Sequence, residues 1–193
     1  MSKPKKSIDY TLLSLTIGLV AFGFIMLTSA SGPLGFEKFG DTYWFIKHQM
    51  LFGMLPGLVA MFILSRVPYT FWKKIASVLL FTSIALLILV FIPGIGADFG
   101  SARSWIVIGG FSFQPAEIVK LTFLLYLAAW FENRADKDVQ DWSSGFVPFM
   151  SSLGIIMLLM ILQPDVGTMT VIIAIALAGY FVSGASWKHL LSI

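Results

Sequence analysis

The stretch YTLLSLTIGLVAFGFIMLT, residues 10–28, contains no charged side chain and is apolar over most of its length. A helix crosses the roughly 30 Å core of a bilayer with about 20 mostly apolar residues, so this run predicts a membrane-spanning helix. Comparable uncharged runs recur along the chain at 49–65, 75–93, 145–162 and 166–183, and a shorter run at 117–131 carries Lys120. The sequence therefore predicts an all-α fold, a polytopic integral membrane bundle of about six transmembrane helices in a single transmembrane domain over 1–193.

The composition excludes several other classes of protein. Hydrophobic residues make up 58% of the chain and charged residues 12%, against about 45–50% and about 25% in soluble domains. A soluble core cannot bury that surplus, and disorder requires low hydrophobicity with high charge. The chain has no cysteine, which excludes a disulfide framework or a cysteine-based zinc site. A net charge of +3 without a basic patch argues against nucleic acid as a partner.

The Lys and Arg residues predict the orientation of the bundle. Cytoplasmic loops of membrane proteins carry an excess of these residues. With the N-terminus cytoplasmic, nine of them fall on the inner side: Lys3, Lys5, Lys6, Arg66, Lys73, Lys74, Arg134, Lys137 and Lys188. Four fall on the outer side: Lys38, Lys47, Arg103 and Lys120. We also expect the first span to remain uncleaved, because its apolar run is longer than the roughly 7–15 residues of a signal peptide.

The start of the fourth span combines a helix signal with charge. Pro115 suits the first helical turn, and Glu117 favours the positive end of the helix dipole. Lys120 follows three residues later on the same face, so the two charges can form a simple surface pair. Lys120 also lies about one turn inside the membrane, where a lysine is costly unless it snorkels or has a partner. The pattern leaves both interpretations open.

Asp165 is the second charged residue of interest. It lies between the fifth and sixth spans, directly after Pro164, and Thr168 follows three residues later. One interpretation is an N-cap carboxylate of the sixth span with Thr168 beside it. The other is a carboxylate on the outer side that pairs with Lys120 or holds a divalent cation together with a phosphate. Spacing does not decide between them.

The segment 94–116 is long for a simple connection, which is typical of functional loops. It is rich in glycine and contains Arg103, whose guanidinium can bind phosphate oxygens through two hydrogen bonds. Contact of this arginine with a lipid headgroup or a carboxylate is an equally good interpretation.

Taken together, these segments resemble the SEDS family (shape, elongation, division and sporulation). The resemblance lies in the glycine-rich outer loop over 100–106, in Phe113-Gln114-Pro115-Ala116-Glu117-Ile118-Val119-Lys120, and in Gln163-Pro164-Asp165-Val166-Gly167-Thr168. Three further segments are more similar to the cell-division branch than to the elongation branch: Thr28-Ser29-Ala30-Ser31, Asp41-Thr42-Tyr43-Trp44-Phe45 with Gln49, and Pro93-Gly94-Ile95-Gly96. The resemblance extends over essentially the whole sequence.

The resemblance implies a peptidoglycan glycosyltransferase that polymerises lipid II at the outer face of the bacterial cytoplasmic membrane, at the septum. It implies a class B penicillin-binding protein, other division proteins and membrane lipids as partners. It implies Mg²⁺ or Mn²⁺ as a cofactor, with ligands left unassigned. Asp165 and Lys120 would be supporting catalytic residues of the cavity. The substrate-binding residues would be Arg103, Trp105, Gln114, Glu117, Gln163 and Thr168.

The resemblance also implies that the general base is an aspartate in an outer loop between the seventh and eighth of ten spans. We therefore expect the sequence to correspond to the N-terminal part of the family fold and to be inactive alone. Three alternatives fit the same charged residues: a lipid II flippase, an elongation-type polymerase, and a non-catalytic membrane scaffold.

Overall fold

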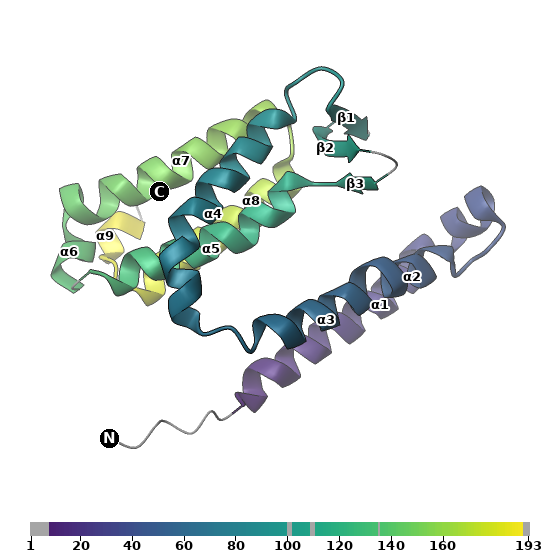
Figure 1. Ribbon diagram of the computed structural model, residues 1–193, viewed down its shortest axis with the longest axis horizontal. Helices are drawn as coiled ribbons and strands as arrows, with labels where there is room; N and C mark the ends of the chain where they lie inside the picture. The colour runs from purple at the N-terminus through teal and green to yellow at the C-terminus, as the bar shows by residue number, and fades with distance from the viewer. Residues whose placement is uncertain (1–7, 100–101, 109–110, 135, 191–193) are drawn as a thin grey trace. The chain divides into compact units, whose positions relative to one another are not determined.

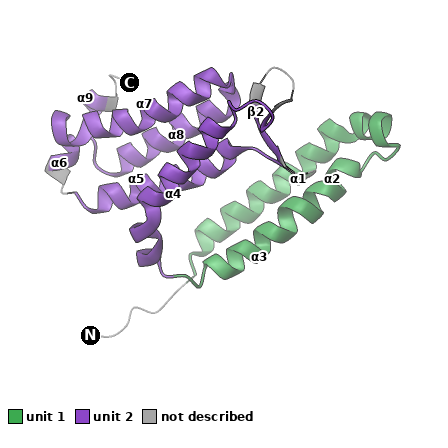
Figure 2. Ribbon diagram, turned by 45° about the horizontal axis from the view of Figure 1, so that its top comes forward, with its two compact units in different colours: residues 1–67 green, residues 68–193 purple. Residues whose placement is uncertain are grey.

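The computed structural model describes residues 8–99, 102–108, 111–134 and 136–190 (Figure 1). These residues group into two compact units, 1–67 and 68–193, which Figure 2 shows in different colours. The sequence predicted a single transmembrane domain over 1–193. The two units are described in turn.

The first unit is a helical hairpin. Its elements are α1 (Tyr10–Phe39), α2 (Trp44–Gln49), the π-helix η1 (Met50–Met54) and α3 (Leu55–Leu64). The last three follow one another without a break and form one 21-residue helix, Trp44–Leu64. Gly35 lets the α1 backbone approach the connection closely, because a Cβ atom there would lie 2.8 Å from the carbonyl oxygen of Asp41. The hairpin thus closes through a short turn.

Helix α1 extends beyond the predicted span 10–28 for a local reason. The hydroxyl of Thr28 donates to the Phe24 carbonyl at 2.7 Å, and that of Ser31 donates to the Leu27 carbonyl at 2.6 Å. These polar side chains are thereby satisfied within the helix and do not end it. The helix ends at Gly40, whose φ of 68° is the left-handed conformation that favours glycine, and whose N–H donates to Phe36.

The second unit is a four-helix bundle with a small sheet. Its elements are α4 (Tyr69–Leu89), β1 (Gly96–Phe99), β2 (Ala102–Ile108), β3 (Phe111–Phe113), α5 (Pro115–Glu132), α6 (Asp136–Gln140), the π-helix η2 (Trp142–Phe146), α7 (Val147–Leu162), α8 (Val166–Val182) and α9 (Trp187–Leu190). Helix α5 packs against α4 and α8, and α7 packs against α8 and α4. The four long helices therefore surround one core.

That core is made of buried apolar side chains from all four helices. They include Leu80, Leu87, Val119, Phe123, Leu127, Phe149, Leu153, Ile156, Met160, Ile172, Ala176 and Tyr180. A polar contact between helices also lies within the core, where the hydroxyls of Ser83 on α4 and Thr122 on α5 lie 2.8 Å apart. A hydrogen bond between helices satisfies both groups without water, as an apolar environment requires.

The segment 94–116, predicted as a long loop, contains a three-stranded antiparallel sheet in the order β1-β2-β3. Ile106 pairs with Gly96 on one side and with Phe113 on the other, and its side chain is buried. The sequence did not predict these strands. We call the part of this unit that holds the sheet, the start of α5 and the α7–α8 connection the sheet end (Figure 1).

Four described helices are long and apolar enough to cross a membrane: Tyr10–Phe39, Trp44–Leu64, Tyr69–Leu89 and Trp142–Leu162. Helix α8 is apolar but shorter, with 17 residues, and α5 has 18 residues with three charged ones. All six long helices lie where the sequence predicted spans. The prediction of a polytopic helical membrane fold is confirmed.

Gly145 provides a stability test of the bundle. It is buried in η2, and a Cβ atom there would lie 2.6 Å from the carbonyl oxygen of Asp138 and closer still to that of Val139. We expect Gly145→Ala to destabilise the protein by about 1–3 kcal/mol, as overpacking does. Gly154→Ala is the matched control, since nothing lies within 4 Å of its Cβ position. Unfolding in detergent measures both, and equal effects would contradict the prediction.

Candidate functional site

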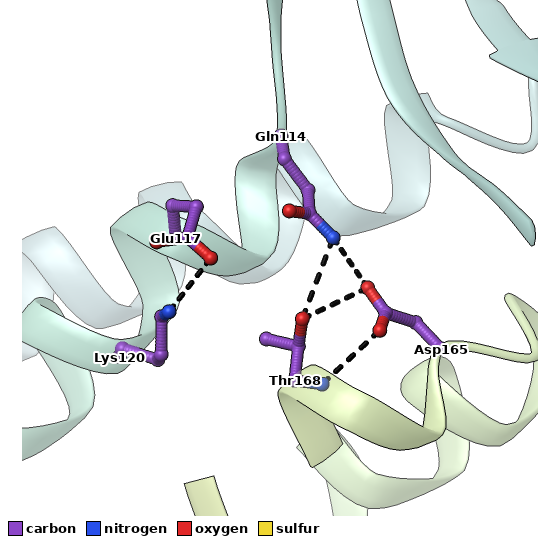
Figure 3. A network of polar contacts seen from close by, with 5 residues as sticks. All are labelled: Gln114, Glu117, Lys120, Asp165 and Thr168. Atoms are coloured by element: carbon purple, nitrogen blue, oxygen red, sulfur yellow. Dashed lines mark hydrogen bonds and ion pairs between the residues drawn. The ribbon is translucent and has the colours of Figure 1, made fainter. Parts of the chain in front are cut away.

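Gln114 links the sheet to α5 and points away from its own helix. It is the N-cap residue of α5, with extended backbone angles, and Pro115 occupies the first helical position. Its side chain makes no capping hydrogen bond to α5. The amide is therefore available to reach another element, and it reaches the start of α8 (Figure 3).

Asp165 is the N-cap of α8. One carboxylate oxygen, Oδ1, accepts the backbone N–H of Thr168 at 3.1 Å. The other, Oδ2, accepts the Thr168 hydroxyl at 3.0 Å and the Nε2 amide of Gln114. The capping interpretation of Asp165 and Thr168 is confirmed, and the cap is also tied to α5 by a residue 51 positions away.

Lys120 is paired with Glu117. Its Nζ atom lies 2.6 Å from Glu117 Oε1, and the two side chains are 25% and 56% exposed. Within the part of the chain that the structure describes, Lys120 makes no ion pair with Asp165, whose carboxylate faces Gln114 and Thr168 instead. The alternative in which Asp165 partners Lys120 directly is therefore corrected: i,i+3 geometry on α5 gives Lys120 a nearer carboxylate.

The remaining predicted site residues are placed differently. Gln163 is fully buried, and its Nε2 donates to the carbonyl oxygen of Leu87 at 3.0 Å. Trp105 lies in β2, partly buried, with its backbone paired to Ala97. Arg103 also lies in β2, but its side chain falls outside the part that the structure describes. The sheet end thus gathers Gln114, Asp165, Thr168, Glu117 and Lys120 (Figure 3), while Gln163 is buried in the protein interior.

Sequence reasoning missed Leu87, which contributes a backbone carbonyl to this end of the bundle. Every residue has a backbone carbonyl group, so no sequence motif can identify the one that accepts this hydrogen bond. The hydrogen bond from Gln163 to Leu87 joins residues 76 positions apart, so only the folded structure reveals it.

The site combines a paired cation with a fixed carboxylate. The N-terminal ends of α5 and α8 meet there, which places positive helix-dipole ends next to Glu117 and Asp165. Lys120 is partly exposed and can exchange its Glu117 partner for an incoming anion, such as a phosphate. Asp165 is held by three hydrogen bonds and accepts donors in a fixed direction.

A divalent cation does not find a complete site here. Over the described ranges, no group of three or more His, Cys, Asp or Glu side chains could hold a metal ion. Glu117 and Asp165 already accept hydrogen bonds from other side chains. The described residues therefore form no metal cage by themselves.

Comparison with known proteins places the chain in a family. Residues 10–193 match the family model FTSW_RODA_SPOVE, described as cell cycle protein. A probable peptidoglycan glycosyltransferase FtsW of Geobacter sp. (strain M18) is 35% identical over 96% of this chain and 50% of its own length. Stage V sporulation protein E of Bacillus subtilis is 36% identical over 98% of this chain and 51% of its own length.

Solved structures agree with this assignment. The crystal structure of the rod shape determining protein RodA of Thermus thermophilus superimposes with a TM-score of 0.74 at 28% identity, covering 98% of this chain and 58% of that chain. A chain from a peptidoglycan synthase complex gives a TM-score of 0.66 at 29% identity, covering 89% and 50%. The chain spans about half the length of the curated relatives it matches. It is a multi-pass membrane protein and belongs to the FtsW/RodA/SpoVE family of cell cycle proteins, the SEDS family.

Proposed function

We propose that this chain forms part of a peptidoglycan glycosyltransferase of the cell-division type, which polymerises lipid II at the outer face of the cytoplasmic membrane. The observation that carries the proposal is the polar cluster at the sheet end. There the two motifs behind the resemblance, 113–120 and 163–168, meet through the Gln114–Asp165 hydrogen bond. Relatives named as probable peptidoglycan glycosyltransferases support the reaction class.

The proposed role of Lys120 follows from the chemistry of the substrate. Lipid II carries a pyrophosphate leaving group, and positive charge on the departing phosphate lowers the barrier to its loss. The Lys120 ammonium is partly exposed and held on α5 by Glu117. In this proposal Lys120 stabilises the leaving group, and Asp165 keeps Gln114 and the start of α8 in place around it. Activation of the attacking hydroxyl is assigned to the aspartate that the resemblance implies beyond the sixth span.

The partner protein and the location in the cell are inferred from similar proteins. A similar chain was solved in a peptidoglycan synthase complex, which is described as coordinating polymerisation and crosslinking. We therefore propose a class B penicillin-binding protein as the partner and the septum as the site of action. A divalent cation stays a prediction, and no step here depends on it, because the described side chains form no cage for one.

The test uses the full-length protein that contains this sequence, purified with its penicillin-binding partner and reconstituted with lipid II. We expect glycan strands on a gel, and their loss on replacing Lys120 by Met. A parallel assay follows movement of fluorescent lipid II between the leaflets of protein-containing vesicles. Transport of lipid II without polymer would overturn the proposal in favour of a flippase. Partner binding with neither activity would favour a scaffold.

A further inference from the structure

Gln163 is a fully buried amide at the sheet end of the second unit. It follows directly after α7 and lies two residues before Asp165. A glutamine amide brings two N–H donors and an acceptor oxygen, and burying these groups is unfavourable unless they are hydrogen-bonded. The position of Gln163 therefore calls for a specific partner.

That partner is the last turn of α4. Gln163 Nε2 donates to the Leu87 carbonyl oxygen at 3.0 Å, across 76 positions of the chain. The last carbonyls of a helix have no donor within it. Here the N–H of Phe91 donates to Ile88 instead of continuing the α-helical pattern to Leu87. The amide of Gln163 thus satisfies a carbonyl that belongs to a fully buried residue.

The bond fixes the short connection between α7 and α8. The backbone N–H groups of Gln163 and Asp165 both donate to Met160, at 3.2 and 3.4 Å, which keeps the connection compact. Gln163 and Asp165 are thus held in one short turn, and the Asp165 carboxylate in turn accepts the amide of Gln114.

We propose that Gln163 is a positioning residue: it anchors the α7–α8 connection to the end of α4 and so holds the Asp165 carboxylate against Gln114. The catalytic consequence rests on the proposed function, whereas the anchoring does not. Gln163 acts from the interior and touches no substrate. Its Oε1 atom is buried without a hydrogen-bond partner among the described residues, so the anchor is one bond, made by the donor side of the amide.

Hydrogen exchange in the full-length protein tests the anchor without reference to activity. Gln163→Met keeps the length of the side chain and removes the donor. We expect the backbone amide of Thr168, which donates to Asp165, to exchange at least about tenfold faster in this variant, since local opening becomes easier. Unchanged exchange at Thr168 would overturn the proposal.

Gln140→Met is the matched control. Gln140 Nε2 also donates to a backbone carbonyl, that of Gly184, at 3.0 Å, but its side chain is exposed and lies away from the sheet end. We expect this variant to leave the exchange of Thr168 unchanged. An equal acceleration in both variants would show a general loosening of the bundle and would also overturn the proposal.

Kinetics of polymerisation separate positioning from substrate contact. We expect Gln163→Met to lower kcat at least about tenfold and to leave KM within about twofold, because the lost interaction acts on the reacting geometry. A raised KM with unchanged kcat would make Gln163 a substrate ligand and overturn the proposal. If the wild-type protein forms no polymer, the proposed function fails while the exchange experiment still decides the anchor.

Gln163→Glu provides an independent test if the Met variant does not fold. A protonated Glu side chain can donate to the Leu87 carbonyl, whereas a carboxylate cannot and would face another acceptor. We expect slow exchange at Thr168 at acidic pH and fast exchange at alkaline pH, beyond the intrinsic trend measured on the wild type. A profile parallel to the wild type would overturn the proposal.

Discussion

Replacing Asp165 by Asn is expected to lower polymerisation by the full-length protein roughly 100-fold, the scale of losing one fixed electrostatic group. Asn caps helices about as well as Asp, so the N-cap of α8 remains. The substitution removes the negative charge of the carboxylate, whose Oδ2 atom accepts hydrogen bonds from the Gln114 amide and the Thr168 hydroxyl. The rate of glycan formation measures the effect, and growth complementation at an unchanged amount of membrane protein confirms it in cells.

Asp141→Asn is the matched control for this variant. Asp141 is also an N-cap, of η2, and its carboxylate accepts the N–H groups of Ser143 and Ser144 at 2.9 and 2.8 Å. The hydrogen bond from the Ser144 backbone, with those from the Ser143 and Ser144 hydroxyls, lowers the pKa of Asp141 to about 2. Because the pKa is lowered, the ionised Asp141 cap stabilises the folded protein at pH values above the usual pKa of an aspartate. This stabilisation is lost as the pH falls towards about 2.

Near neutral pH, Asp141→Asn therefore removes an N-cap charge away from the sheet end. We expect it to retain activity close to that of the wild type. If Asp165→Asn is as active as Asp141→Asn, Asp165 is only a capping residue, and its part in the proposed site is wrong.

Much of the fold could be predicted because each helix carries its own signal. The apolar run of 10–28 suffices to predict a helix, and the bilayer sets its minimum length. The ends of the helices were harder to predict. Thr28 and Ser31 read as the exit of the first span, yet their hydroxyls bond back to helix carbonyls and the helix continues to Phe39.

The sheet could not be predicted for a different reason. Its strands are short, and their pairing depends on contacts between β2 and both neighbours, which no single strand encodes. Isolated short strands are marginal, and β2 gains support from packing against α5. The sequence of 94–116 alone does not show that one of its strands packs against α5.

The candidate site was predictable in its residues but not in its pairings. The motifs identified Gln114, Asp165 and Lys120, and local spacing allowed both the Glu117–Lys120 pair and the Asp165–Thr168 cap. The contact between Gln114 and Asp165 joins two helix starts 51 residues apart, and it arises from the packing of α5 against α8. Periodicity along one helix contains no information about such a contact.

Replacing Lys120 by Met is expected to abolish measurable polymerisation, a loss of roughly 100-fold to 1,000-fold. Met keeps the apolar stem of the side chain and removes the ammonium group that would meet the leaving phosphate. The side chain is only 25% exposed, so its charge acts in a less screened environment than that of a surface lysine. Lys120→Arg keeps the charge but changes the donor geometry, and we expect partial activity.

Lys73→Met is the matched control for Lys120→Met. Lys73 pairs with Glu132 at 3.2 Å, and its side chain is 30% exposed, close to the value for Lys120. Solvent reaches both partners of this pair, since Glu132 is 49% exposed, and exposed ion pairs contribute only about 0–1 kcal/mol, so loss of a pair alone should matter little. We expect Lys73→Met to retain most activity. Equal losses in both variants would mean that the positive charge of Lys120 has no special role at the sheet end.

The variant Glu117→Gln separates the two members of the Lys120 ion pair. A loss of activity on removing Lys120, together with a smaller effect of Glu117→Gln, would mean that the ammonium acts on the substrate. Glu117 would then hold this ammonium until the substrate binds.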